Sequence, residues 1–447
     1  MTPGAASSLT EGRLRPVILR LALPAVGMMA CHFTFNLIDT IWVGRLIGPA
    51  ALAAVSTGGF LVWVVLSLGE MMDVGLIAVA ARRHGQGLPD HAAQAAAGAV
   101  LAAVGVGTVT AVVGFQLIDP LFAVMRVPAD VAALGRQYLG TWLLGAPLVF
   151  GFFALEAAFR ASGDTRTPFT ILAASVALNA VLDPLLITGA GPLPAEGVRG
   201  AAAASVAVRG LAFVLLLVIA VRRRRLLHFG EPDWAAVPTI LKVGAPMSLS
   251  GVLLSLIYVW LTRYTAQFGT PALAALGIGH KMEGLGFIAI SGFALSAGAL
   301  VGQNLGAGNP ERARKAVRLT IKYCLAVTVT TAIAFLTIPA VLVRLFTSDP
   351  MVVADGVLYL RIISIAQIGQ SFELILEAAM AGAAYTFWPM VVSGTLTGMR
   401  IPLAGWWSGV VGVVGIWWAL SLTAAGRGVA MAAFWRWAGW QRTRGPL

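Results

Sequence analysis

The sequence predicts an all-α integral membrane protein with about twelve transmembrane helices in two pseudo-symmetric six-helix bundles. Three observations support this fold class. Hydrophobic residues make up 58% of the 447 residues and charged residues only 11%, against about 25% charged residues in typical soluble domains. Apolar runs long enough to cross a bilayer recur along the whole chain. Several short motifs recur at a fixed spacing, which indicates an internal repeat.

The apolar runs divide the chain into twelve spans and a linker. Each span has about 20 residues or more, the length that a helix needs to cross a bilayer, and runs of this length exclude a barrel of short alternating strands. The expected spans are 16–44, 50–81, 92–118, 134–160, 168–190, 199–221, 238–268, 272–302, 315–346, 351–381, 388–410 and 412–438. They form an N-terminal lobe at 16–221 and a C-terminal lobe at 238–438, joined by a cytoplasmic linker at 222–237.

The repeat relates the two lobes. The motif Gly-x-Gly-x-Pro that begins at Gly85 recurs at Gly306, and the motif Leu-Glu-Ala-Ala that begins at Leu155 recurs at Leu376. Six spans separate the copies, so both lobes have the same orientation and are related by an axis along the membrane normal. Two such bundles facing each other enclose a central cavity, which is the architecture of alternating-access carriers.

The net charge of +12 comes from basic clusters between the apolar spans. These clusters are Arg82-Arg83, Arg160 with Arg166, Arg222 to Arg225, Arg312 to Lys322, and Arg436 to Arg444. With a cytoplasmic N-terminus and alternating spans, every cluster falls on the cytoplasmic side, which is the positive-inside pattern. We therefore expect a multi-pass protein of the plasma (inner) membrane, and no binding of nucleic acid.

Two pairs of an amide and an acid lie inside the apolar spans. Asn36 and Asp39 are three residues apart in the first span, and Asn179 and Asp183 are four apart in the fifth, so each pair shares a helical face. Since an acid in hydrocarbon is costly, it should face a cavity or a partner. By residue count both acids lie in the outer leaflet, which predicts one shared site in the N-terminal lobe. The alternative is a set of buried polar residues that only helps the helices to associate.

Paired carboxylates suit the handling of protons. Such a site can hold a proton or a cation but not easily both, and this exclusivity is the basis of antiport. It predicts cationic or weakly basic substrates. Pro24 and Pro184 each remove a backbone hydrogen bond from the same two helices, so both are candidate hinges, with a static kink as the alternative.

Other ionisable residues inside the spans are secondary candidates, because an intramembrane charge is costly. They are Glu70 and Asp73 in the second span, Glu283 in the eighth and Glu373 in the tenth. No Walker A, HExxH or GxSxG motif occurs in the sequence, so nothing supports an ATP-driven pump or a hydrolase. The five His and two Cys lack the spacing of metal ligands, so we expect no metal site.

Several longer motifs together resemble the multidrug and toxic compound extrusion (MATE) family. They are Asn36-x-x-Asp39-Thr40-x-x-Val43-Gly44, Phe159 to Pro168, Leu178-Asn179-x-x-x-Asp183-Pro184, and Val301 to Gly308. The similarity runs over residues 15 to 440, and the pattern in the fifth span is similar to the DinF-like branch of the family.

The resemblance implies a two-lobed efflux carrier that is coupled to protons or sodium. In the DinF-like branch, the residues that match Asp39, Asp183 and Asn179 form the cation or proton site, and a hydroxyl that matches Ser205 joins them. Gln370 stands where another branch has an acid on the tenth span, and the seventh span has no acid. Both departures argue against a sodium site in the C-terminal lobe.

We therefore expect a secondary antiporter, not an enzyme, that exports small cationic amphipathic compounds in exchange for protons, or for sodium, by alternating access. It should need no cofactor, contact the lipid bilayer and function as a monomer. The alternative is a flippase for a lipid-linked or amphipathic anionic precursor, whose cavity should be lined with arginine; Arg209, Arg400 and Arg427 are the residues to check. A channel or a scaffold would need neither buried acids nor kinked helices.

Overall fold

The computed structural model describes residues 7–125, 129–189 and 194–437, and within these ranges the secondary structure is helical, with no β-strand. The long helices are α2 (Leu14–Leu46), α3 (Pro49–Gly85), α4 (Pro89–Met125), α5 (Ala129–Ala161), α6 (Arg166–Thr188), α7 (Gly197–Ile219), α8 (Val237–Ala266), α9 (Thr270–Gly306), α10 (Pro310–Thr337), α12 (Pro350–Gly382) and α15 (Val413–Trp437). The shorter ones are α1 (Ser7–Thr10), the π-helix η2 (Ala220–Arg224), α11 (Pro339–Arg344), α13 (Phe387–Gly398) and α14 (Arg400–Val411). The expected all-α fold is confirmed.

Eleven helices of the described chain are long and apolar enough to cross a membrane. The single span expected at 388–410 is instead two helices, α13 and α14, with a turn at Met399 between them, and together they supply the twelfth crossing. The span expected at 315–346 is also interrupted, because α10 ends at Thr337 and Pro339 begins α11. Proline lacks the N–H that would continue the preceding helix. The expected ends at 190 and 438 lie outside the described residues.

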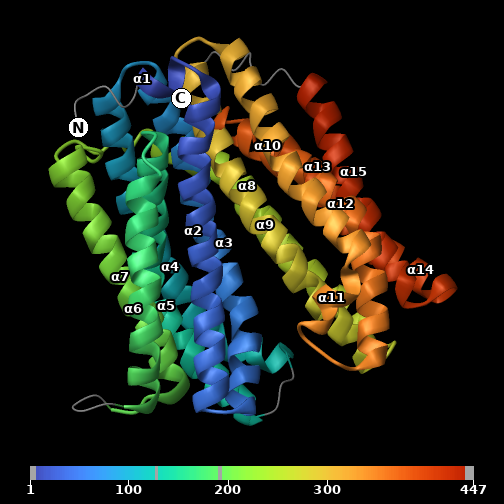
Figure 1. Cartoon of the computed structure of the whole chain (residues 1–447). Helices are drawn as coiled ribbons and strands as arrows, with labels where there is room; N and C mark the ends of the chain where they lie inside the picture. The colour runs from blue at the N-terminus through green and yellow to red at the C-terminus, as the bar shows by residue number, and fades with distance from the viewer. Residues whose placement is uncertain (1–6, 126–128, 190–193, 438–447) are drawn as a thin grey trace.

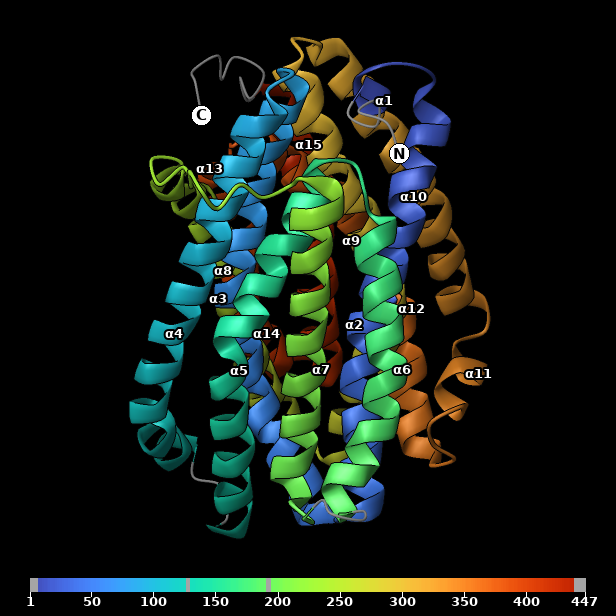
Figure 2. The same cartoon turned by 90° about the vertical axis from the view of Figure 1, so that its left-hand side faces the viewer.

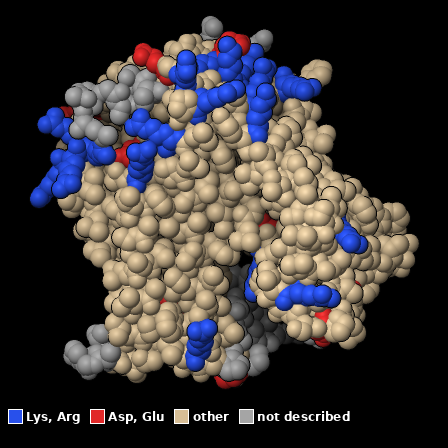
Figure 3. Space-filling view, viewed as in Figure 1, with Lys and Arg blue, Asp and Glu red and all other residues tan. Residues whose placement is uncertain are grey.

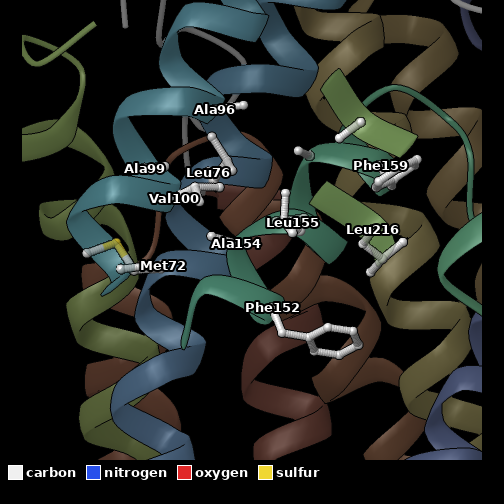
Figure 4. Close-up of a cluster of buried hydrophobic side chains, with 14 of the residues drawn as sticks. Met72, Leu76, Ala96, Ala99, Val100, Phe152, Ala154, Leu155, Phe159 and Leu216 are labelled. Carbon is white, nitrogen blue, oxygen red and sulfur yellow. The ribbon is translucent and has the colours of Figure 1, made fainter. Parts of the chain in front are cut away.

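The helices form two bundles, α2–α7 and α8–α15, that stand side by side (Figures 1 and 2). In the first bundle, α3, α4, α5 and α7 meet in an apolar cluster (Figure 4). Its labelled residues are Met72, Leu76, Ala96, Ala99, Val100, Phe152, Ala154, Leu155, Phe159 and Leu216. In the second bundle, a separate apolar cluster around Tyr359 and Trp417 joins α8, α9, α12 and α15. Each bundle therefore has a core of its own.

The two bundles meet along α2, α3, α8 and α9. Near the C-terminal ends of α3 and α9, the contact runs through glycines. A Cβ on Gly85 would lie 1.9 Å from the Gln303 carbonyl oxygen, and one on Gly306 would lie 2.1 Å from that of Arg82. A side chain at either position would collide with backbone, so only glycine fits. Gly85 and Gly306 are equivalents in the sequence repeat, so this contact is pseudo-symmetric. We call it the glycine contact.

The segment 9–12 adds a second contact across the bundles at the same end. Leu9 is buried between Gly163, which follows α5 in the first bundle, and α9 in the second. The guanidinium of Arg312 donates to the carbonyl oxygens of Leu9, Glu11 and Gly12 at 3.4, 2.5 and 2.9 Å. The chain before α2 is thus fastened to both bundles.

Basic side chains gather at the end of the molecule that carries α1, as Figure 3 shows from one side. Arg442 and Arg444 of the last basic cluster lie outside the described residues. Arg160 corrects the expected pattern, because it is only 2% exposed and forms an ion pair with Asp73 inside the first bundle. Its charge therefore belongs to the interior and not to the basic surface.

The linker lies against the first bundle and is fixed by ion pairs. Arg83 pairs with Asp233 at 2.7 Å, and Arg224 pairs with Asp164 at 2.9 Å. Burial acts to raise the pKa of Asp233, but the hydrogen bond and the charge of Arg83 outweigh it and hold this pKa below its usual value. The linker is thus part of the surface of the first bundle.

Candidate functional site

Asp39, Asn179, Asp183 and Ser205 form one buried hydrogen-bonded group between α2, α6 and α7, which we call the acid pair site. Asn179 Nδ2 donates to Asp39 Oδ1 at 2.9 Å and to Asp183 Oδ2 at 3.0 Å. The Ser205 hydroxyl donates to Asp39 Oδ2 at 2.8 Å. Asp39 is 2% exposed, and the other three side chains are fully buried. Since both carboxylates accept from one nitrogen, they lie well within about 10 Å, the range of strong interaction between charges.

Helix geometry explains why these residues meet. Asn179 and Asp183 are one turn apart on α6, so their side chains lie on one face, and α6 packs against both α2 and α7. The small residues 200–204 of α7 allow a close approach to α6. A Cβ on Gly200 would lie 2.3 Å from the Leu186 carbonyl oxygen. The small residues end at Ser205, whose hydroxyl reaches the acid pair.

A buried cation lies beside the acid pair site. Arg209 follows Ser205 by one turn of α7 and is 5% exposed. Its guanidinium lies 4.3 Å from the ring centroid of Phe35 and 4.8 Å from that of Trp142, within the range of a cation–π interaction. Among the described residues, neither Arg209 Nη1 nor Asp183 Oδ1 has a hydrogen-bond partner. The site thus contains an unused donor and an unused acceptor.

Asn36 does not join this group. It is exposed, and its amide donates to the His32 carbonyl oxygen of its own helix at 3.1 Å. The prediction that it shares a site with Asp39 is wrong for a geometric reason. Three residues turn a helix by about 300°, and the remaining offset is enough to leave Asn36 outside while Asp39 points inward.

The two candidate hinges lie in continuous helices. Helix α2 runs from Leu14 to Leu46 through Pro24, and α6 continues from Pro184 to its end at Thr188. The proposed role of both prolines as hinges stays a prediction.

Glu70 and Asp73 have different surroundings, although both lie on α3. Asp73 is buried and forms an ion pair with Arg160 of α5, whereas Glu70 is exposed. One turn before Arg160, Glu156 Oε2 lies 3.6 Å from His32 Nε2 of α2. These contacts connect α2, α3 and α5, and they do not include the acid pair site.

The two acidic candidates of the second bundle contact an arginine and a tyrosine. Glu373 of α12 pairs with Arg427 of α15 at 2.7 Å. Glu283 of α9 accepts a hydrogen bond from the Tyr359 hydroxyl. All four side chains are at most 9% exposed. The polar interior of this bundle therefore combines acids with their counter-charges or donors.

The remaining candidates of the second bundle are also held inside it. Arg400, at the start of α14, donates from Nε to Thr423 Oγ1 at 2.9 Å. Gln370 is partly buried, and its Oε1 has no hydrogen-bond partner among the described residues. Neither side chain is connected to the acid pair site by a contact in the structure.

Sequence reasoning treated Arg209 only as a candidate for an anion cavity and missed its place beside the acids. A signal was present, because Arg209 stands four residues after Ser205 in one span, and such residues share a face. The pair of Asp73 and Arg160 gave no comparable signal, since the two residues are 87 positions apart on different helices.

Two bundles of membrane-spanning helices with a buried acid pair in one of them define a multi-pass membrane transporter. The chain belongs to the MatE family, whose model matches residues 24–185 and, a second time, residues 246–406. The resemblance to the MATE multidrug efflux transporters is therefore confirmed, and one match falls in each bundle. The assignment to the DinF-like branch stays a prediction.

The chain is similar to curated transporters over most of its length. It is 28% identical over 423 residues to a FAD transporter of Shewanella oneidensis, which covers 93% of this chain and 92% of that protein. It is also 28% identical over 397 residues to a probable multidrug resistance protein NorM of Thermotoga maritima, which covers 88% and 85%.

Solved structures share the fold. An outward-facing multidrug resistance MATE transporter matches with a TM-score of 0.90 at 23% identity over 98% of both chains. The Vibrio cholerae MATE transporter VcmN in the bent form matches with a TM-score of 0.88 at 21% identity, again over 98% of both chains. The two-lobed fold of twelve crossings is therefore shared with known transporters.

Proposed function

We propose that this chain exports organic cations in exchange for protons by alternating access. The observation that carries the proposal is that Asn179 Nδ2 joins Asp39 and Asp183 in one buried group. Two carboxylates this close accommodate a proton or a cation, but both together only at high cost. This exclusion couples the release of a cation to the uptake of a proton. Relatives named as multidrug resistance or multidrug export proteins support this class of substrate.

Within the pair, we assign the exchanged proton to Asp183. Both oxygens of Asp39 accept hydrogen bonds, from Asn179 and from Ser205, and these bonds stabilise a carboxylate. Asp183 Oδ1 has no donor among the described residues, and a buried acceptor without a partner is costly. A proton at this oxygen removes the charge and leaves Oδ2 free to accept from Asn179.

Alternating access requires one closed end and one end that can open. The glycine contact closes the end that carries α1, because it brings the backbones of α3 and α9 together. We propose that this end is cytoplasmic, since basic side chains gather there (Figure 3) and cytoplasmic loops are enriched in them. On this proposal, the structure is the outward-facing state, and turning inward separates α3 from α9.

The test is the export of a fluorescent organic cation from proteoliposomes under an imposed pH or sodium gradient. We expect the pH gradient to drive export by the wild type, and Asp39→Asn and Asp183→Asn to reduce export to the level of empty vesicles. Asn36→Ala is the matched control, because this amide lies on α2 outside the site. Full gradient-driven export by both acid variants would overturn the proposed proton site.

Export of an amphipathic anion is the second candidate, because one relative is named as a FAD transporter at 28% identity over 93% of this chain. A carrier for such an anion needs cationic side chains that are open to its cavity. Arg209, Arg400 and Arg427 are only 5%, 3% and 9% exposed, which favours the cation. FAD replaces the dye in the same vesicles; gradient-driven export of FAD without export of the dye would favour the anion.

A further inference from the structure

The buried arginine beside the acid pair site has no role in the proposal above. Arg209 is held between the rings of Phe35 and Trp142, with its guanidinium 4.3 and 4.8 Å from their centroids. Burying a guanidinium is costly unless its charge is balanced. Among the described residues, Arg209 forms no ion pair, and its Nη1 has no hydrogen-bond partner. Because burial of this charge is costly, we expect the charge of Arg209 to have a function.

The groups that act on this charge come from every long helix that packs against α7. They are Asp39 of α2, Tyr138 and Glu156 of α5, and Asp183 of α6. Glu156 already faces His32 at 3.6 Å. The acid pair is therefore a set of negative charge that Arg209 can balance. With both acids ionised, the two carboxylates and Arg209 carry a net charge of −1.

One hydrogen-bond donor and one hydrogen-bond acceptor near the acid pair have no partner among the described residues. Arg209 Nη1 is a donor and Asp183 Oδ1 is an acceptor, and both are buried without a partner. A proton on Asp183 leaves the guanidinium stacked between its aromatic rings. When that proton is lost, Asp183 becomes an anion in a buried site, and the guanidinium of Arg209, whose charge interacts with Asp183, can balance it. The two atoms form no hydrogen bond in this structure, so their pairing requires a change in the rotamer of Arg209.

We propose that Arg209 is a tethered counter-cation, which pairs with deprotonated Asp183 and so takes the place that a sodium ion would need. The inference rests on the proposed proton exchange at the acid pair and names Arg209 as the residue that selects the coupling ion. A sodium ion at the acids would have to displace a cation held in the same molecule at high effective concentration. A proton does not, because it binds to a single oxygen.

The test is the equilibrium binding of radioactive sodium to the purified, detergent-solubilised protein at a pH above neutrality. Arg209→Met keeps a long apolar stem and removes the charge, so it should bind sodium at least about tenfold more tightly than the wild type. Arg209→Lys keeps a charge and should stay weak. Arg263→Met is the matched control, because that guanidinium also lies over a ring, 5.4 Å from the Trp260 centroid, but is exposed.

Equal sodium affinity of Arg209→Met and the wild type would overturn the proposal. If Arg209→Met does not fold, the folding of the double variant Arg209→Met with Asp183→Asn tests the proposal. Removal of the acid removes the need for its counter-cation. Recovery of a folded double variant supports the proposal, and continued misfolding overturns it. Failure of the proposed function would appear separately, as wild-type vesicles that export no cation under a pH gradient, since sodium binding requires no transport.

Discussion

The two bundles share one helical plan but differ in their polar interiors. In the first bundle, the amide of Asn179 joins two acids. The repeat places Arg400 at the position of Asn179, and it places Trp260 or Leu261 at the position of Asp39. Trp260 is 45% exposed and Leu261 is fully buried, and neither side chain is an acid. Equivalent positions therefore carry a buried acid and its amide partner in one lobe, and a buried arginine and an uncharged side chain in the other.

The packing positions, in contrast, are kept. Tyr138 lies against Gly58 in the first bundle, and its repeat equivalent Tyr359 lies against Gly279 in the second. A Cβ at these glycines would come within 3.3 Å and 2.2 Å of the tyrosine rings. Both bundles therefore keep packing contacts between their helices and the Leu-Glu-Ala-Ala motif, whereas the polar residues Asp39 and Asn179 of the first bundle have no counterparts of the same type in the second. In the second bundle the buried acid Glu373 is paired with Arg427, whereas Asp39 and Asp183 of the first bundle share the amide of Asn179.

The largest expected effect follows from removing the arginine of the ion pair between Glu373 and Arg427 in the second bundle. Arg427→Met leaves Glu373 as a buried charge without its partner, and loss of one member of a buried ion pair typically destabilises by about 3–5 kcal/mol. We expect thermal unfolding in detergent to show this loss, while folded molecules still respond to the pH gradient. The double variant with Glu373→Leu should recover most of the stability. If folded Arg427→Met no longer exported the dye in response to the pH gradient, ion exchange would involve both bundles.

The next largest effect is expected at the glycine contact, to which both bundles contribute. Gly85→Ala and Gly306→Ala each push a methyl group into backbone of the facing helix, and overpacking of this kind costs about 1–3 kcal/mol. Both variants should shift the equilibrium by similar amounts toward separation of α3 and α9, as measured by distances between spin labels on the two helices. Gly105→Ala on α4 is the control, since its Cβ would meet nothing within 4 Å. A response from only one of the pair would contradict the pseudo-symmetry.

A smaller effect is expected from the loss of one hydrogen bond at the acid pair site, compared with the loss of a similar hydrogen bond in the second bundle. Ser205→Ala removes one hydrogen bond to Asp39, which is worth about 1.5–3 kcal/mol when the acceptor is charged, so the pH for half-maximal export should move upward. Ser421→Ala is the matched control, because its hydroxyl donates to the Ile362 carbonyl oxygen at 2.7 Å in the second bundle. The same pH shift in both variants would show that the effect is structural.

The smallest expected effect is that of Asn36→Ala. The amide is exposed and bonds only to its own helix in the described chain, and surface substitutions of this kind usually change stability by less than about 0.5 kcal/mol. Export of the dye and thermal stability should both match the wild type. A loss of coupled export comparable to that of Asp39→Asn would return Asn36 to the site in another conformation.

The sequence predicted the fold from composition and span length, because a bilayer imposes a simple rule on helix length. It also brought Asp39 and Asp183 together correctly, since depth along two helices can be counted from their ends. It failed where the outcome depended on rotation about a helix, as for Asn36, or on a partner from another helix, as for Arg160. The break before α14 was missed because Gly398 and Met399 are common inside membrane helices and carry no strong stop signal.

The fastening of segment 9–12 has a practical consequence for experiments on this protein. Arg312 holds three carbonyl oxygens of the segment, and Leu9 is buried between the bundles. A group attached just before Leu9 therefore lies close to the place where the two bundles meet. We expect an affinity tag at this position to disturb the contacts of the segment with both bundles. For kinetic work, labels belong instead on exposed positions of the linker between the lobes, whose ion pairs are made with the first bundle.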